Sequence, residues 1–260
     1  EYAYSALSVF AGGSGFVVVR SGRTGALVRS LSASQPGDGF GYSLARAGDV
    51  DGDGVQDLVV GAPWATERAL LGGAARVFSG ASGATVGFQS GARDFAAFGY
   101  AVGALDADWD GDGKQDWLAS APWNDEGAGF ESGSLFALGA YDPITGRSAV
   151  VQRLDGSAGD ALGSAIAAGG DVNGDGALDV AAACLPAGVV RLFSGKAAHA
   201  LLDELPSRET GDRFGSALAL GGDWNLDGYA ELALGAPWDG STNAGRGYVY
   251  DLGWREPTVI

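Results

Sequence analysis

One acidic segment of nine residues occurs four times along the chain, and no other feature limits the possible folds as strongly. The four copies begin at residues 49, 108, 171 and 223, so they recur every 52 to 63 residues. Each copy has an acidic or amide side chain at positions 1, 3 and 5, an acidic side chain at position 9, and an apolar run after it. Such self-similarity is typical of repeat architectures, in which every repeat is one supersecondary unit. The chain is therefore predicted to fold as a tandem array of similar units.

Each acidic segment lies inside a longer unit that has two further motifs. A Phe-Gly or Leu-Gly pair stands nine or ten residues before the segment, at Phe40, Phe98, Leu162 and Phe214. A Gly-Ala-Pro tripeptide ends the apolar run at 61–63 and 235–237, with Ser-Ala-Pro at 120–122 and Ala-Cys-Leu at 183–185. Residues 16–31 resemble only the later half of a unit, so the first unit is predicted to be partial.

The units are predicted to consist of β-strands. Each contains about four short β-rich runs separated by Gly, Asp and Ser turns, and no segment combines helical periodicity with capping residues. Four strands in 50–60 residues, repeated in tandem, are typical of a propeller blade. A two-sheet sandwich would not require internal similarity, and a β-solenoid has a shorter period. We expect the partial first unit to lack its inner strand, unless residues 4–10 supply it.

These observations predict one all-β domain over residues 1–260, a β-propeller of about five four-stranded blades. The expected blade boundaries are 1–39 for the partial blade, then 40–97, 98–161, 162–213 and 214–260.

The composition excludes several classes of partner and location. The 260 residues include 32 acidic and 16 basic side chains, a net charge of −16, which is unsuited to binding a phosphate backbone. No apolar run approaches the ~18 residues that a membrane span needs. The segment positions 1, 3, 5 and 9 hold 14 of the 32 acids, so the excess acidity is concentrated in the repeats.

The acidic segments have the chemistry of calcium loops. Calcium prefers six to eight oxygen ligands from carboxylates, amides, backbone carbonyls and water. Position 6 is always glycine, which suits a sharp turn, and the varied side chains at position 7 are compatible with a carbonyl ligand. The absence of His and Cys disfavours transition metals, and magnesium is less suited because it demands strict octahedral geometry. A helical calcium hand is excluded, since position 12 is apolar instead of glutamate.

The Phe-Gly pair, the Asp-x-Asp-x-Asp-Gly-x-x-Asp loop and the Gly-Ala-Pro tripeptide together resemble FG-GAP repeats. Such repeats form the blades of integrin alpha-chain propellers and of many bacterial extracellular proteins. The resemblance covers about residues 40–251 and implies a secreted protein, extracellular or at the cell surface. Integrin-type propellers have seven blades, which is more than this chain can supply. The third full repeat departs most in its motifs, and the fourth has Leu226 and Glu231 where glycine and aspartate are expected.

The resemblance also implies up to four Ca²⁺ ions, one in each loop. With the carbonyl donors at position 7, the predicted ligand residues are Asp49, Asp51, Asp53, Val55 and Asp57; Asp108, Asp110, Asp112, Lys114 and Asp116; Asp171, Asn173, Asp175, Ala177 and Asp179; and Asp223, Asn225, Asp227, Tyr229 and Glu231.

Residues outside the loops do not indicate an enzyme. The single histidine, His199, is expected at the surface without a Ser–His–Asp grouping, and the single cysteine, Cys184, lies among alanines and is expected to be a buried apolar residue. Trp64, Trp123 and Trp238 recur after the Ala-Pro step, and this repetition favours packing between blades, with stacking on sugar rings as the alternative.

The leading hypothesis is therefore a non-catalytic, calcium-binding extracellular propeller that acts as an adhesion, protein-interaction or scaffold module. The alternatives are a carbohydrate-binding propeller lectin and the accessory propeller of a larger secreted enzyme. The expected ligand is a protein or a glycan, with no nucleic acid and no membrane span. An incomplete blade would also permit self-association through an unpaired strand edge.

Overall fold

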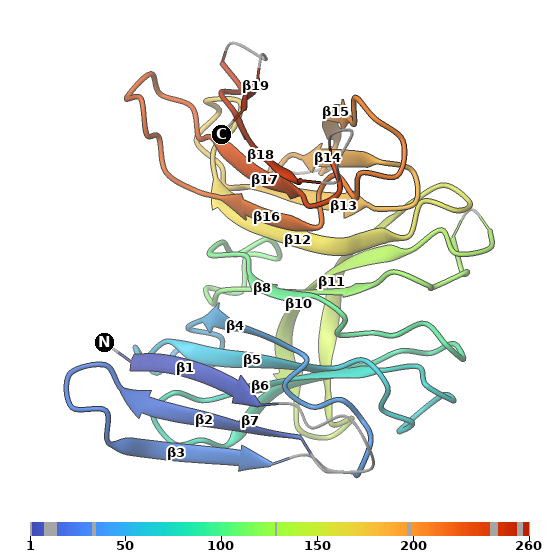
Figure 1. Cartoon of the computed structure of the whole chain (residues 1–260). Helices are drawn as coiled ribbons and strands as arrows, with labels where there is room; N and C mark the ends of the chain where they lie inside the picture. The colour runs from blue at the N-terminus through green and yellow to red at the C-terminus, as the bar shows by residue number, and fades with distance from the viewer. Residues whose placement is uncertain are drawn as a thin grey trace.

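The computed structural model describes residues 2–7, 15–32, 35–127, 129–196, 199–239, 244–253 and 257–259. Within these ranges the protein is all-β, with 19 strands in five antiparallel sheets and no helix, so no helix there could cross a membrane. Four of the sheets are four-stranded propeller blades and the fifth is a partial blade, which confirms the predicted fold class. Figure 1 shows the sheets following one another in chain order, from the first at the bottom to the last at the top.

The first sheet has three strands and each later sheet has four. Blade 1 consists of β1 (Tyr2–Leu7), β2 (Phe16–Ser21) and β3 (Leu27–Ser32), and blade 2 of β4 (Ser43–Gly48), β5 (Asp57–Ala62), β6 (Ala74–Phe78) and β7 (Thr85–Ser90). Blade 3 consists of β8 (Val102–Ala104), β9 (Trp117–Ala121), β10 (Ser134–Asp142) and β11 (Arg147–Asp155). Blade 4 consists of β12 (Leu162–Gly170), β13 (Asp179–Cys184), β14 (Val189–Phe193) and β15 (Leu201–Pro206), and blade 5 of β16 (Ala217–Leu220), β17 (Leu232–Ala236), β18 (Arg246–Tyr250) and β19 (Pro257–Val259).

Blade 1 begins with a strand in the second position of a blade. β1 pairs with β2 in the same antiparallel manner as β5 pairs with β6, and β2 corresponds to β6 in sequence. No described strand occupies the inner position on the other side of β1. Residues 2–7 therefore do not form the inner strand that the sequence left open for 4–10, and residues 8–10 lie outside the described part of the chain.

The hydrophobic core is divided among the contacts between successive blades. The second strands β5, β9 and β13 are buried along their whole length, in keeping with their mostly apolar sequences. The repeated Phe or Leu before each acidic loop is buried in one inter-blade cluster: Phe40 between blades 1 and 2, Phe98 between 2 and 3, Leu162 between 3 and 4, and Phe214 between 4 and 5. The motif thus supplies the large side chain that joins each blade to the preceding one.

The glycine of the Phe-Gly pair allows the backbones of two blades to approach closely. Gly99 has φ of 81°, and a Cβ atom there would lie 2.3 Å from the carbonyl oxygen of Ala74 in blade 2. A Cβ on Gly61, in the Gly-Ala-Pro tripeptide of blade 2, would lie 2.0 Å from the carbonyl oxygen of Gly99. The two repeat motifs therefore meet across the blade interface, and side chains at either glycine would collide with backbone.

Candidate metal centres

All four acidic loops connect the first and second strands of a blade, so they occupy equivalent ends of blades 2 to 5. Neighbouring loops also touch. The Gln115 Oε1 atom of the second loop accepts the Asp49 N–H of the first at 2.8 Å, and the Ala230 N–H of the fourth donates to the Asp171 carbonyl of the third at 2.8 Å. We number these loops 1 to 4 in chain order.

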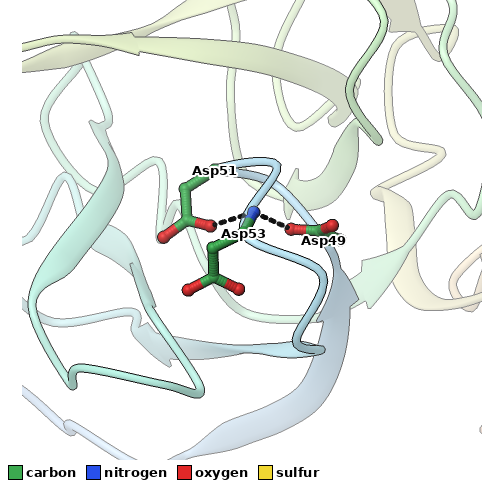
Figure 2. A group of neighbouring side chains, drawn as sticks. All are labelled: Asp49, Asp51 and Asp53. Atoms are coloured by element: carbon green, nitrogen blue, oxygen red, sulfur yellow. Dashed lines mark hydrogen bonds between the residues drawn. The ribbon is translucent and has the colours of Figure 1, made fainter.

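Loop 1 is folded around the carboxylate of its first aspartate. Asp49 Oδ1 accepts the N–H groups of Gly52 and Asp53 at 2.8 and 3.0 Å, and Oδ2 accepts the N–H of Gly54 at 2.9 Å. Asp51 Oδ1 also accepts the Asp53 N–H, at 3.1 Å. Figure 2 shows the carboxylates of Asp49 and Asp51 on either side of this nitrogen, with the Asp53 carboxylate beside that of Asp51. The three residues bring one carboxylate oxygen each to within 4.8 Å of one another.

The other loops repeat this geometry with one change. In loops 1 to 3 the residue at position 4 is glycine with φ of 71–79°, and its N–H donates to the first aspartate. Loop 4 has Leu226 there, at φ of 64°, a conformation that costs a non-glycine residue about 1–2 kcal/mol. The glycine at position 6 has φ of 85–97° in all four loops, and its N–H always bonds the first aspartate.

The buried carboxylates at position 9 differ among the loops. Asp57 accepts the N–H of Val50 at 2.9 Å and that of Gly80 at 3.0 Å, so both of its oxygens are bonded. Asp179 is bonded in the same way by Val172 at 2.9 Å and Gly195 at 2.8 Å. The residues 79–80 and 194–195 are the Ser-Gly turns that recur in the sequence, and they supply the second donor in each case.

In loops 2 and 4 one oxygen of this carboxylate has no partner in the described part of the chain. Asp116 Oδ2 accepts the Trp109 N–H at 2.7 Å and Glu231 Oε2 accepts the Trp224 N–H at 2.6 Å. Asp116 Oδ1 and Glu231 Oε1 are buried without a hydrogen bond to any described residue.

Burial also shifts the acidity of these groups. It raises the pKa of Asp57 and of Asp179. It raises the pKa of Asp116 to about 7, with a contribution from the nearby carboxylates of Asp110 and Asp108 and against the hydrogen bond from Trp109. A cation beside these carboxylates would favour their ionised form.

The structure brings together three acidic groups that could hold a metal ion. Within the described residues these are Asp49, Asp51 and Asp53; Asp108, Asp110 and Asp116; and Asp223, Asp227 and Glu231. Among the described residues, loop 3 forms no such group of three acids, and Lys196 lies against it. The Lys196 Nζ atom donates to the Asp175 carbonyl at 2.6 Å and lies 3.7 Å from the Asp175 carboxylate.

The residues at position 7 make the same backbone hydrogen bond in all four loops. The N–H groups of Val55, Lys114, Ala177 and Tyr229 donate to the carboxylate at position 5 at 2.8–3.0 Å. The use of their carbonyl oxygens as ligands remains a prediction.

The sequence did not single out two residues that contact the loops. One is Gln115, at position 8 of loop 2, which contacts loop 1. The other is Asp251, whose Oδ2 accepts the Asn225 Nδ2–H at 2.9 Å. Asp251 stands where Ser79 and Ser194 stand in blades 2 and 4, so an alignment of the hairpins after the third strand could have found it.

The remaining candidate residues have varied surroundings. Cys184 is fully buried, as predicted, and burial raises the pKa of its thiol to about 12. His199 was expected at the surface, but it is half-buried because its ring stacks on Trp109 with centroids 3.7 Å apart, and burial lowers its pKa.

The tryptophans after the Ala-Pro step are not enclosed between blades. Trp123 and Trp238 are exposed and Trp64 is half-buried. Trp64, Tyr42, Tyr100 and Trp123 form a continuous row across blades 2 and 3, with successive ring centroids 5.1–5.4 Å apart.

Comparison with known proteins identifies similar repeats elsewhere. The family model for the FG-GAP repeat matches residues 40–84 and 214–250. Integrin alpha-PS5 of Drosophila melanogaster is 36% identical over 152 residues, which are 54% of this chain and 15% of that protein. Integrin alpha-V of Gallus gallus is 31% identical over 227 residues, 80% of this chain and 21% of that protein. Integrin alpha-7 of Homo sapiens is 39% identical over 105 residues, 38% of this chain and 9% of that protein. The chain thus spans about a fifth or less of the length of these relatives.

Proposed function

Since this chain is an FG-GAP repeat protein similar to integrin alpha chains, we propose that it is a calcium-binding propeller module that binds another macromolecule without catalysing a reaction. The observation that carries the calcium assignment is the set of equivalent acidic loops, three of which bring carboxylate oxygens of three acids within 4.8 Å of one another. Two of these loops contain a buried carboxylate oxygen that accepts no hydrogen bond from any residue that the structure describes. Such an oxygen is costly to bury unless a cation or donor completes it.

The donor set suits calcium. The side chains at positions 1, 3, 5 and 9 are carboxylates or amides, with Asp49, Asp51, Asp53 and Asp57 in loop 1 as the model for the others. These are hard oxygen donors, and no histidine or cysteine stands at the ligand positions. When bound, calcium would neutralise the clustered charge. In each loop, backbone N–H groups donate to the carboxylate of the first aspartate and so fix the loop conformation. Each of blades 2 to 5 would thus carry one calcium site at the end where its loop lies.

Calcium binding is tested by melting the protein with calcium and with excess chelator. A ligand present at 100 times its Kd stabilises a single native site by about 2.7 kcal/mol, and four sites by about 11 kcal/mol. For 260 residues the unfolding entropy is about 0.55 kcal/mol/K, so we expect calcium to raise Tm by about 20 °C. The same Tm in both solutions, with no metal by elemental analysis, would reject the assignment.

We propose further that the module acts outside the cell in adhesion, protein binding or scaffolding. The support is the similarity to integrin alpha chains and the absence, among the described residues, of a histidine-centred nucleophile or metal group: His199 contacts Trp109 and the Ser194 carbonyl. The test is calcium-dependent attachment of cells to the immobilised chain. Attachment should be lost in chelator and restored by calcium. Attachment no greater than to an albumin-coated surface would contradict the adhesion role.

Carbohydrate binding is a second candidate, favoured by the aromatic row across blades 2 and 3. Aromatic rings with one apolar face and a polar edge are suited to interfaces. Of the four rings, Tyr42 and Trp123 are exposed. A glycan array tests this role: binding that is lost in Trp123→Ala would support it, and an array without bound glycans would reject it.

A further inference from the structure

The four loops differ in how the carboxylate at position 9 is completed. In loops 1 and 3, both oxygens of Asp57 and of Asp179 accept backbone N–H groups. In loops 2 and 4, Asp116 is only 1% exposed and Glu231 only 3%, yet one oxygen of each has no donor among the described residues. Both residues belong to the acidic groups described above, so each has carboxylate oxygens of two further acids within 4.8 Å of one of its own oxygens.

The difference originates in the hairpin that follows the third strand of each blade. β6 and β14 end at Phe78 and Phe193, and the Ser-Gly turn that follows directs the N–H of Gly80 or Gly195 to the carboxylate. The donor lies 23 residues after Asp57 in the chain and 16 after Asp179. It is therefore set by the end of the third strand and not by the loop itself.

Blade 3 has no such turn at this place. β10 continues to Asp142, with register shifts on either side of Leu138, so Gly139 takes the position of the turn serine and remains in the strand. A Cβ atom on Gly139 would lie 2.9 Å from Asp116 Oδ1 and 2.8 Å from Asp110 Oδ2. Gly139 therefore lies beside the unpartnered oxygen of Asp116, and a carboxylate oxygen of Asp110 lies near the same point.

Blade 5 lacks the Ser-Gly turn for a different reason. By strand register, Asp251 and Leu252 take the places of Ser79 and Gly80. The turn thus adds an acidic side chain to loop 4, where Asp251 accepts the Asn225 amide, and supplies no N–H to Glu231 Oε1.

We infer that loops 2 and 4 depend on a bound cation to complete a buried carboxylate, whereas loops 1 and 3 are completed by the N–H of the Ser-Gly turn. The inference rests on the proposed calcium binding. A ligand that binds only the native state stabilises it, and local parts of a structure open independently. Removing calcium should therefore loosen blades 3 and 5 before blades 2 and 4.

Two matched substitutions test the difference in the calcium-free protein. In Asp116→Asn, the amide can keep its oxygen on the Trp109 N–H and direct its NH₂ group toward Asp110, which supplies the missing partner. In Asp57→Asn, both side-chain oxygens of the original aspartate accept N–H groups, from Val50 and Gly80. The new NH₂ group must therefore replace one acceptor and point a donor at another donor. We expect Asp116→Asn to raise Tm in chelator and Asp57→Asn to lower it.

The second measurement is hydrogen exchange of the full chain, with calcium and with chelator, at about pH 8.5, where carboxyl groups are ionised. On chelation, exchange over 105–121 and 223–236 should accelerate about tenfold more than over 49–62 and 171–184, as expected for losing one partner of a buried charged group. Equal acceleration in all four loops, or a lower Tm of Asp116→Asn in chelator, would overturn the inference while leaving calcium binding intact. If calcium changes neither exchange nor Tm, the proposed function itself fails.

Discussion

The buried phenylalanine of the repeat gives a direct test of how the blades are joined. Phe98 is 2% exposed and lies in the core between blades 2 and 3, where its ring is 5.2 Å from that of Phe136. Truncating a buried phenylalanine to alanine removes its apolar burial and leaves a cavity, at a cost of about 3–5 kcal/mol. With an unfolding entropy of about 0.55 kcal/mol/K for 260 residues, Phe98→Ala should lower Tm by about 5–9 °C.

The chain offers a matched control three residues away. Phe95 lies in the same connection between β7 and β8, but it is 56% exposed. Phe95→Ala should change stability by about 0.5 kcal/mol or less, as surface substitutions do. Both variants are melted by calorimetry in saturating calcium, so that cation binding is equal. Equal losses in the two variants, or a loss below 1 °C in Phe98→Ala, would refute the assignment of Phe98 as the residue that joins the blades.

Three further predictions concern residues outside the loops. Because burial lowers the pKa of His199, the unfolded chain takes up a proton first as pH falls through about 6.5, so stability is present above that pH and lost below it. The fall in Tm between pH 7.5 and 5.5 should thus be smaller in His199→Gln, and identical Tm profiles would contradict this. Cys184 should resist thiol reagents in the native protein and react only after unfolding in urea, because it is buried and its pKa is raised to about 12; rapid native labelling would argue against its burial. Gly99→Ala should destabilise the protein more than Gly159→Ala in chemical denaturation, since both glycines have φ of 81° but only a Cβ at Gly99 would meet backbone; equal losses would show that the close approach is absent.

The fold could be predicted from the sequence where a short pattern of residues occurs in every repeat. The second strands β5, β9 and β13 are buried along their whole length, and each appears in the sequence as a mostly apolar run. The spacing of the acidic segments then indicated blades. The position of β1 was not predictable, because the sequence of residues 2–7 does not encode which neighbour the strand will pair with.

The loops divide in the same way between local and distant determinants. The bonds around Asp49 join residues three to five apart, so the nine-residue pattern was sufficient to indicate them. The partner of Asp57 is the N–H of Gly80, which reaches it only because β6 ends at Phe78. In blade 3, β10 continues past the equivalent position, and Asp116 is left without this donor. The length of the third strand therefore determines whether the carboxylate at position 9 receives a second N–H donor. The nine-residue sequence of the loop does not encode this.

The aromatic row across blades 2 and 3 was also not predicted as a unit. Repetition of Trp64, Trp123 and Trp238 favoured packing between blades, but the inter-blade cores are filled by the phenylalanines and leucine of the Phe-Gly position. Tyr42 and Tyr100 connect Trp64 to Trp123 through the residue that follows each Phe-Gly pair. The corresponding residues in blades 4 and 5 are serines, which restricts the row to blades 2 and 3.

The central claim is that the four acidic loops are calcium sites, and the number of calcium ions bound per chain tests it most directly. Native mass spectrometry of the full chain in calcium should give a mass increase of up to four Ca²⁺ ions, and Asp49→Ala should bind one ion fewer. Isothermal titration would give the same stoichiometry in solution. A chain that retains no calcium under these conditions, or an Asp49→Ala variant with undiminished stoichiometry, would contradict the account.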